Sequence, residues 1–459
     1  MENYITVLLP VAFIVILIGV LNSLRIFTII SVLSKQYQLL KQSVINQEDY
    51  PPLIIFIAVL KESRIIAKTL ESFNQLSYPR DKLKIVIVST EREYETNPSP
   101  HKNTILIVKN KVIELNQNQE EQKFVHIHYP FLKGIKSDQL NYALAEIQKT
   151  FPKLINNKTY IGLYDADSNV PTDTLVLLAK DAIREKYPEV YQQPTFYFKN
   201  YAFLPHTVNG VLSGAFSFLQ TAYALYYETY ILGTYPSAPI TPKLPRMKYC
   251  IGHGLFIKWD LLEKLGLFPT PIEDTRLGHI LSYLKKEIRI LPVFDAVETT
   301  SGILAQIKQT SVWFIGEAFF IKDLKIAQGF MKMKLSKLHN IWLIIYKIYR
   351  NVFWIVRGPL LLFLFIFSLY SQIVILGFAI LIAYLYLPAI GLILSRHRLS
   401  QLIAAPIPFS KKNALFTFWA LLALLLEIVI MSIGALLGLM YFIRFSYAKE
   451  SLPFFKTDR

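Results

Sequence analysis

Two pairs of neighbouring acidic residues have a spacing that suits chemistry on a phosphorylated substrate. Asp165 and Asp167 are one residue apart at the end of an apolar run. Carboxylates at this spacing supply the oxygen ligands that Mg²⁺ or Mn²⁺ prefers, and such an ion would bridge the phosphates of a substrate; the alternative is a turn with two solvated acids. Glu273 and Asp274 stand at an expected helix N-terminus. A carboxylate there can take a proton from a nearby hydroxyl, or the pair can serve only the helix dipole.

Cationic and polar side chains lie in three other short segments. Lys133 and Lys136 flank Gly134 before a helical segment. Two cations suit a diphosphate or a carboxylate, and the glycine permits close backbone approach; a solvated loop is the alternative. Glu62 and Thr90 each come where an apolar run ends. These residues predict a polar site beside the ends of strands.

Gln309, Trp313 and His253 complete the set of candidates. Gln309 and Trp313 are four residues apart, and a tryptophan can either stack on a sugar ring or lie in an interfacial belt. His253 stands between two glycines, where it either bonds a substrate or is structural. The single cysteine, Cys250, excludes an intramolecular disulfide and is expected to be a small apolar filler.

Apolar runs that alternate with helical segments must position these residues. Such alternation predicts a parallel α/β sheet covered on both faces, with ligands bound beyond the carboxyl ends of the strands. Residues 97–122 are expected to form a polar surface insertion. The expected strands are 52–60, 83–90, 123–129 and 160–167, and the expected helices are 63–77 and 137–149.

Both ends of the chain contain apolar segments long enough to cross a bilayer of about 30 Å. Residues 5–33 predict one retained transmembrane helix, residues 358–394 two passes and residues 413–442 a third. Lys35 and Lys41 follow the first segment, so the positive-inside rule places the central domain in the cytosol. Three later passes would place the tail outside, whereas its basic residues favour the cytosol; a re-entrant hairpin at 413–442 is the alternative.

The formal net charge is +16, from 49 basic and 33 acidic residues among 459. Such a charge suits nucleic acid, anionic lipid or a phosphate-bearing substrate. No nucleic-acid-binding motif stands out and apolar segments are present, so membrane lipids and a nucleotide diphosphate are the expected partners. Residues 315–357 mix basic and apolar side chains and predict helices in the headgroup layer, or an ordinary amphipathic cover of the central domain.

The order and spacing of these pieces between apolar ends resemble the family 2 membrane glycosyltransferases, which are inverting enzymes. The resemblance spans roughly residues 50 to 315 and rests on the D-x-D pair, the Glu-Asp pair, Lys-Gly-x-Lys with a following Leu-Asn-x-Ala, and Gln309 with Trp313. It implies a GT-A (Rossmann-like) nucleotide-sugar domain inserted between transmembrane helices. It also implies a nucleotide-sugar donor, preferably a UDP-sugar, and a divalent cation, Mg²⁺ or Mn²⁺.

The resemblance also implies a role for each matching residue. Asp274 corresponds to the general base and Asp167 to the metal ligand. The residues implied at the donor are Glu62, Thr90, Lys133, Lys136 and Asp165, and those implied at the acceptor are His253, Glu273, Gln309 and Trp313.

Three positions depart from the family pattern. Ile272 replaces the Thr before the Glu-Asp pair, and Val312 replaces an Arg before the Trp. The segment Ser89-Thr90-Glu91 stands where many members have an Asp pair that contacts the base, which leaves the nucleotide open. Loss of the Arg at 312 weighs against, without excluding, a processive synthase.

The expected organisation has five parts. The function expected is transfer of a sugar to a lipid-linked or polysaccharide acceptor at the cytosolic face, in a multi-pass protein of a bacterial inner membrane. The alternatives are a processive β-polysaccharide synthase coupled to export, and a catalytically inactive membrane scaffold. The parts are 1–48 (helix and linker), 49–314 (GT-A domain), 315–357 (interface helices), 358–443 (about three passes) and 444–459 (basic tail).

Overall fold

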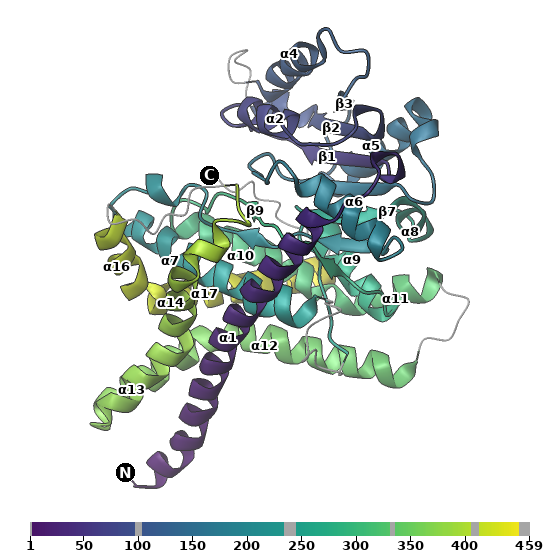
Figure 1. Ribbon diagram of the computed structural model, residues 1–459. Coiled ribbons are helices and arrows are strands. Elements are labelled where there is room, and N and C mark those ends of the chain that lie inside the picture. The colour runs from purple at the N-terminus through teal and green to yellow at the C-terminus, as the bar shows by residue number, and fades with distance from the viewer. Residues whose placement is uncertain (1, 97–102, 234–244, 331–335, 405–412, 449–459) are drawn as a thin grey trace.

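The computed structural model describes residues 2–96, 103–233, 245–330, 336–404 and 413–448. An α/β domain lies at the upper end of the molecule in Figure 1, and a group of long helices lies below it. The predicted basic tail from residue 449 onward lies outside the described residues.

A seven-stranded, mostly parallel sheet forms the centre of the α/β domain, in the order β3-β2-β1-β4-β7-β5-β8. The four predicted strands are confirmed as β1 to β4, which pair in parallel. The short strand β7 runs antiparallel to β4 and β5. A second sheet pairs β6 with β9. The strands are β1 (Leu53–Ala58), β2 (Leu83–Thr90), β3 (Phe124–Tyr129), β4 (Tyr160–Tyr164), β5 (Val190–Gln192), β6 (Thr195–Phe196), β7 (Leu255–Lys258), β8 (Arg289–Ile290) and β9 (Asp295–Ala296).

Helices cover both faces of this sheet because successive strand residues point to opposite sides. Ile54 and Phe56 pack with α5, α8 and α9, whereas Ile55 and Ile57 pack with α2, α4 and α6. The α/β class is therefore confirmed. The helices of this domain are α2 (Ile66–Asn74), α3 (Arg92–Thr96), α4 (Thr104–Asn116), α5 (Lys136–Thr150), α6 (Thr174–Arg184), α8 (Trp259–Lys264) and α9 (Glu273–Tyr283).

Helix α4 occupies much of the segment expected to be a polar surface insertion. Its Val108 and Val112 are buried, and the helix contacts α2 and β3. Its buried apolar residues recur every three to four positions, which gives one buried stripe along the helix. The segment thus covers part of the sheet instead of standing away from it.

Among the described residues, four helices are long and apolar enough to cross a membrane, one before the α/β domain and three after it, as the apolar runs predicted. A turn at residues 371–372 joins the second of these helices to the third. Helix α12 runs unbroken through the predicted boundary at residue 357. The segment 413–442 is divided between two helices that meet near Ala423. The helices are α1 (Glu2–Gln42), α12 (Lys337–Tyr370), α13 (Val374–Leu381) continued by the π-helical Ile382–Tyr386 and α14 (Leu387–Leu394), α15 (Arg396–Leu399), α16 (Ala414–Leu422) and α17 (Leu424–Ala448).

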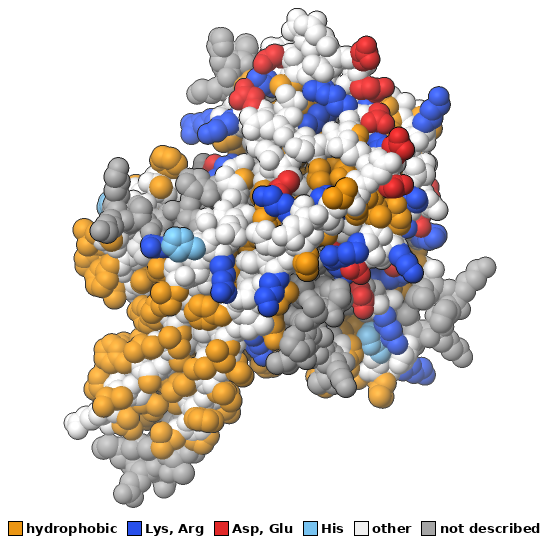
Figure 2. Space-filling view, in the orientation of Figure 1, with side chains coloured by type: hydrophobic (Ala, Val, Ile, Leu, Met, Phe, Trp, Pro, Cys, Tyr) orange, Lys and Arg blue, Asp and Glu red, His pale blue; other side chains and the backbone are white. Residues whose placement is uncertain are grey.

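Hydrophobic side chains gather over α13 and the neighbouring described part of α1, at the lower left of Figure 2. Phe13, Ile14, Ile375 and Phe378 are among the exposed ones. A contiguous apolar surface of this kind marks contact with a partner or with lipid. With four long apolar helices in the chain, the hydrocarbon of a bilayer is the matching environment.

Helix α10 is held tightly against α17 by glycines. A Cβ on Gly434 would lie 2.8 Å from the Thr310 Cβ, and one on Gly438 would lie 2.5 Å from the Ser311 carbonyl oxygen. This close packing fixes α10, which carries Gln309 and Trp313. The remaining helices are α7 (Val208–Tyr223) continued by the π-helical Ala224–Leu232, α10 (Ile303–Ala318), α11 (Phe320–Phe330) and the 3₁₀ turns Gln47–Asp49, Arg80–Lys82, Pro152–Leu154 and Tyr201–Phe203.

Candidate active site

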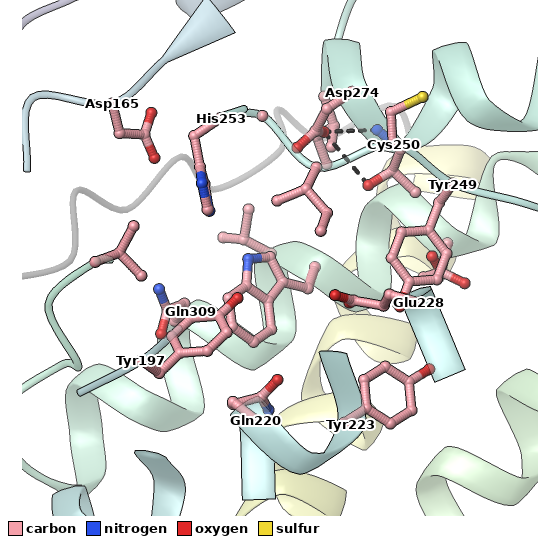
Figure 3. Close-up of a pocket in the computed structure, with 18 of the residues that line it drawn as sticks. Asp165, Tyr197, Gln220, Tyr223, Glu228, Tyr249, Cys250, His253, Asp274 and Gln309 are labelled. Carbon is pink, nitrogen blue, oxygen red and sulfur yellow. Dashed lines mark hydrogen bonds between the residues drawn. The ribbon is translucent and has the colours of Figure 1, made fainter. Parts of the chain in front are cut away.

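A cavity of about 400 Å³ is lined by segments that lie far apart in the sequence. Its walls come from the start of α5, the end of β4, the loop before β7, the start of α9, and helices α7, α10, α12 and α17. Figure 3 shows Asp165, His253 and Asp274 toward one side and Tyr223 and Glu228 toward the other. The predicted site residues that line it are Lys136, Asp165, His253, Glu273, Asp274, Gln309 and Trp313.

Lys136 is the cation at the centre of the acidic side. Its Nζ lies 2.8 Å from the Asp165 Oδ1 and 3.4 Å from the Glu273 Oε1, and it donates to the Gly252 carbonyl oxygen at 3.2 Å. Burial disfavours its charge, but the attraction of Asp165 and Glu273 outweighs burial and raises the Lys136 pKa. The lysine is therefore held in its charged form, joining residues from α5, β4 and α9.

Gly134 allows the chain to turn into α5 so that Lys136 points into the cavity. Its φ is 132°, and a Cβ there would lie 2.5 Å from the Tyr129 hydroxyl oxygen. That hydroxyl donates to the Lys133 carbonyl oxygen at 3.1 Å. A side chain at 134 would meet both a steric and a conformational penalty.

Asp274 and Glu273 are the first residues of α9, as predicted. The preceding Ile272 is in the left-handed region with a φ of 59°, which is strained for a β-branched residue. Burial raises the pKa of both carboxyls, whereas Lys136 opposes that rise. A carboxylate with a raised pKa is a stronger proton acceptor, which suits a general base.

Gly252 lets the backbone pass directly beside this acidic group. A Cβ at 252 would lie 2.8 Å from the Asp274 Oδ2 and 3.2 Å from the Lys136 Nζ. The Asp274 Oδ1 accepts a hydrogen bond from the Thr275 N–H at 2.6 Å. This bond holds one oxygen in place, while Oδ2 lies on the Gly252 side of the cavity.

The D-x-D pair follows β4 and divides between the cavity and the interior. Asp165 lines the cavity, whereas Asp167 is fully buried and lies outside the lining. The Asp167 Oδ2 accepts a hydrogen bond from the Glu298 N–H at 3.2 Å, and the Asp167 carbonyl oxygen accepts one from the Lys199 Nζ at 2.5 Å. Through Glu298, which itself lines the cavity, Asp167 lies next to the cavity wall.

The carboxylates of this turn suit a hard divalent cation in their chemistry. Within the described ranges, no three His, Cys, Asp or Glu side chains are arranged to hold a metal ion. Mg²⁺ is commonly bound through one or two carboxylates with substrate phosphates and water completing its shell. Asp165 and Asp167 fit that mode, and the metal role of Asp167 stays a prediction.

Asp295 connects the D-x-D turn to His253 and was not among the predicted residues. It is fully buried, and its carboxylate accepts hydrogen bonds from the Ser168 Oγ at 2.7 Å and the Asn169 N–H at 3.0 Å. The His253 Nδ1 lies 2.9 Å from the Asp295 Oδ2. Burial alone would lower the His253 pKa, but the bond to Asp295 raises it. Nothing in the local sequence around Asp295 distinguishes it from an ordinary strand residue.

Helix α10 presents Gln309, Val312 and Trp313 to the cavity, as the spacing predicted for the first and last. The Trp313 ring stacks on Phe216, with centroids 6.2 Å apart and planes 19° apart. The Gln309 Oε1 is buried and has no hydrogen-bond partner among the described residues. An acceptor atom in that state is available to a hydroxyl or amide of a ligand.

Three predicted donor residues do not line the cavity. Lys133 is exposed, Thr90 is fully buried at the end of β2, and the Glu62 N–H donates to the Thr104 Oγ1 at 2.9 Å. Glu62 and Thr90 follow the neighbouring strands β1 and β2, at the edge of the sheet where Asp165 follows β4. Their donor roles stay predictions.

The polar segment at the end of β2 is held by contacts within the protein. The Ser89 Oγ lies 2.7 Å from the His126 Nε2 and 3.0 Å from the His128 Nδ1. The His128 Nε2 lies 2.7 Å from the Glu91 Oε2. Burial lowers the His126 pKa to about 4, so this ring is neutral. At this position many members of the resembling family have an Asp pair that contacts the base. This chain instead has a network of Ser89, Glu91 and two histidines.

The other side of the cavity consists of residues that the sequence did not single out. The Tyr249 hydroxyl donates to the Glu228 Oε1 at 2.7 Å, and Arg350 donates to the Tyr223 hydroxyl at 2.6 Å. Burial raises the Glu228 pKa to about 7. Glu228 belongs to the π-helical segment after α7, and π-helical turns often occur at functional sites.

The basic stretch 315–357 does not point uniformly toward headgroups. Lys347 is buried and forms an ion pair with Glu317. Arg350 and Arg357 line the cavity. The sequence predicted either helices in the headgroup layer or an amphipathic cover of the central domain, and neither interpretation placed cations in the interior. The spacing of a basic helix does not show which of its faces a neighbouring helix covers.

No protein-family model matches the chain, and no curated protein matches it. Among solved structures, the chain is similar to the mannosyltransferase PcManGT from Pyrobaculum calidifontis in complex with GDP-Man and Mn²⁺, with 15% identity, 95% of this chain and 100% of that chain covered, and a TM-score of 0.45. It is also similar to S. aureus TarS 1-349 in complex with UDP, with 12% identity, 64% and 70% covered, and a TM-score of 0.36. Both scores are below 0.5, so function is inferred from the geometry of the chain itself.

Proposed function

We propose that this chain is a membrane-bound inverting glycosyltransferase of family 2. It transfers a sugar from a nucleotide-sugar donor, preferably a UDP-sugar, to the hydroxyl of a lipid-linked or polysaccharide acceptor. The observation that carries the proposal is convergence: Lys136, Asp165, Asp274, Gln309 and Trp313 come from four separate motifs and line one cavity.

Asp274 acts as the base in the proposed reaction. It takes the proton of the acceptor hydroxyl, and the freed oxygen attacks the anomeric carbon from the face opposite the diphosphate. The bond between that carbon and the diphosphate oxygen breaks, so the configuration inverts. Burial of Asp274 supports this role because it raises the pKa of the carboxyl toward the working pH.

The remaining residues bind and orient the two substrates. Lys136 places a fixed positive charge beside Asp165, at the side where the diphosphate leaves. Asp165 and Asp167 would hold a Mg²⁺ or Mn²⁺ ion, which when bound neutralises charge on the diphosphate. Gln309, Trp313, His253 and Glu273 bind the acceptor; Trp313 offers the face of an indole, and Gln309 a buried acceptor atom. Glu62, Thr90 and Lys133 bind the donor nucleotide from the sheet edge and the loop before α5.

The long apolar helices anchor the chain in several passes, and we place the α/β domain in the cytosol of a bacterium, at the inner membrane. Lys35 and Lys41 come at the end of the first candidate span, which favours that side. Arg396 and Arg398 are exposed after the third span and favour the same side.

The experiment that tests this function is turnover of a panel of nucleotide sugars by detergent-purified protein, with Mn²⁺ and with a chelator. Hydrolysis or transfer of one donor that needs the metal is the expected result. Long products would identify the processive synthase. No turnover and no metal-dependent binding across the panel would contradict the proposal and favour the inactive scaffold.

A further inference from the structure

Helix α12 has two different faces beside the cavity. Arg350, Phe353, Trp354 and Arg357 are spaced as one helical stripe and line the cavity. The opposite face carries exposed apolar side chains, which include Ile345, Ile348, Tyr349, Val352 and Val356. The helix therefore turns its two arginines toward the interior and its apolar residues outward, the reverse of a soluble surface helix.

The two arginines have aromatic neighbours, and none of the described carboxylates forms an ion pair with them. The Arg350 guanidinium lies 3.8 Å from the centre of the Tyr227 ring, and that of Arg357 lies 5.9 Å from the centre of the Tyr223 ring. The Arg357 Nε is buried and has no hydrogen-bond partner in the described part of the chain. No ion pair joins either arginine to a described carboxylate, whereas the nearby Lys347 has Glu317.

A pair of partly buried guanidinium groups without a paired carboxylate is unfavourable on its own. Guanidinium groups match the oxygens of phosphate in geometry, and charge-assisted bonds to them are strong. The arginines therefore favour an anion with several oxygens. On the acidic side of the same cavity, Lys136 is paired with Asp165 and is assigned to the donor diphosphate. A second phosphate there would be repelled by Asp165, Glu273 and Asp274. The arginine side is the place where it would bind.

A second, apolar hollow of about 30 Å³ adjoins this point. It shares Tyr223, Arg357 and Met431 with the main cavity. Its remaining lining is mostly apolar, with Asn22, Tyr226 and Tyr384 as the polar members, and comes from α1, α7, α14, α17 and both π-helical segments. Its volume admits only the first groups of a hydrocarbon chain, and the rest of a chain would lie along the exposed apolar helices. From the acidic side of the cavity, the lining thus passes to the two arginines and then to the apolar hollow.

We propose that the acceptor is a lipid whose phosphate or diphosphate binds Arg350 and Arg357, with its hydroxyl-bearing part toward Asp274 and its chain toward the apolar hollow. This inference rests on the proposed function for the transfer step. Glu228 lies between Asp274 and Tyr223 in Figure 3, and its buried Oε2 has no hydrogen-bond partner within the described ranges. That oxygen would accept a hydrogen bond from a hydroxyl group of the lipid head and so favour a polyhydroxylated head.

Binding of defined lipids to the full chain in detergent tests the proposal. The ligands are geranylgeranyl diphosphate, geranylgeranyl phosphate, geranylgeraniol and inorganic diphosphate. Binding of each is measured by the quenching of the Trp313 and Trp354 fluorescence. The lipid phosphates should bind, while the alcohol and inorganic diphosphate should bind at least about tenfold more weakly, because each lacks one of the two contacts. Equal binding of geranylgeraniol would overturn the proposal, and equal binding of inorganic diphosphate would show a free phosphate site instead.

Matched variants assign the effect to the arginines. Arg350→Gln and Arg357→Gln should each weaken lipid diphosphate binding about tenfold to a hundredfold, from loss of one charge-assisted contact. Arg350→Lys should weaken it less, because the charge remains. Arg396→Gln is the control, since Arg396 is exposed and lies outside the cavity lining. Unfolding temperatures of all variants show whether any loss of binding follows from a loss of fold.

The outcomes separate this inference from the proposed function. Wild-type turnover of a nucleotide sugar, with unchanged lipid diphosphate binding in both Gln variants, would overturn the inference alone. Loss of nucleotide-sugar binding in those variants, with lipid binding intact, would show that the arginines bind the donor and would also overturn it. Lipid diphosphate binding that depends on the arginines, without any donor turnover, would support the lipid site and contradict the transfer reaction.

Discussion

Replacement of Lys136 by methionine is the most informative single change in the acidic side of the cavity. Methionine keeps the length of the side chain and removes its charge. The change leaves Asp165 and Glu273, which lie 2.8 Å and 3.4 Å from the Lys136 Nζ, without their shared cation. Asp274 is affected as well. A Cβ built on Gly252 would lie 2.8 Å from the Asp274 Oδ2 and 3.2 Å from the Lys136 Nζ. These two atoms therefore lie within about 6 Å of each other, which is close enough for their charges to interact.

The expected magnitude follows from this geometry. An opposite charge within about 4–6 Å lowers a carboxyl pKa by about 1 to 3 units. Lys136 opposes the burial that raises the Asp274 pKa, so its loss should raise that pKa further by about this amount. For stability, the Lys136 and Asp165 side chains are 31% and 27% exposed. The cost should therefore fall between those of exposed and fully buried pairs, at about 1 to 3 kcal/mol.

Two measurements test this prediction. The acidic limb of the pH–rate profile should move upward by about 1 to 3 units in Lys136→Met, because the base must lose its proton before it can act. The loss of stability should grow as pH rises from acid to neutral. Carboxyls whose pKa is raised in the folded state bind more protons there than in the unfolded state, and stability then falls with increasing pH.

Two controls accompany this variant. Lys136→Arg keeps the charge and should retain the position of the acidic limb. Lys149→Met removes an exposed lysine from the last turn of the same helix and should change neither quantity. An acidic limb that stays in place in Lys136→Met, in a folded protein, would refute the electrostatic coupling between Lys136 and Asp274.

Three further changes test other parts of the site. Asp167→Ala should abolish metal-dependent donor binding measured by calorimetry, and unchanged binding would remove its metal role. Val312→Arg should fold with a similar unfolding temperature and tighten diphosphate binding, because Val312 lines the cavity; a collapse of the fold would show that the side chain belongs to the core. Asp295→Asn should lower the His253 pKa, since the charge that most strongly opposes burial is then lost, and should cost about 1 to 3 kcal/mol through lost hydrogen bonds. A His253 pKa that is unchanged by nuclear magnetic resonance would contradict that reasoning.

The sequence predicted the parts of the fold that depend on local pattern. Strands β1 to β4 are continuous apolar runs, and the long apolar helices follow directly from composition. The two- to four-residue strands β5 to β9 were not foreseen, because such short pieces show no periodicity and form through distant pairing. The buried stripe of α4 was missed because the polar residues of the segment hid the three- to four-residue spacing of Ile105, Val108 and Val112.

The candidate site divides in the same way. Asp165, Asp274 and Trp313 lie in short motifs that can be recognised in sequence, and they line the cavity together. Glu228 and Arg350 reach the same cavity from segments more than a hundred residues apart. These segments are joined by contacts of Tyr227 with Tyr346 and Arg350, which the sequence does not reveal. A basic, aromatic helix next to a membrane gives no sign of which face turns inward, so those residues could be found only in the structure.

The account is tested most directly by comparing wild type and Asp274→Asn for donor affinity and for sugar transfer. The asparagine keeps the shape of the side chain and removes the proton acceptor. We predict unchanged nucleotide-sugar affinity and a fall in transfer of about 10² to 10⁴, the usual contribution of a general base. Transfer at a near-normal rate by Asp274→Asn would show that the base lies elsewhere and would contradict the assignment of this cavity's acidic side as the reaction centre.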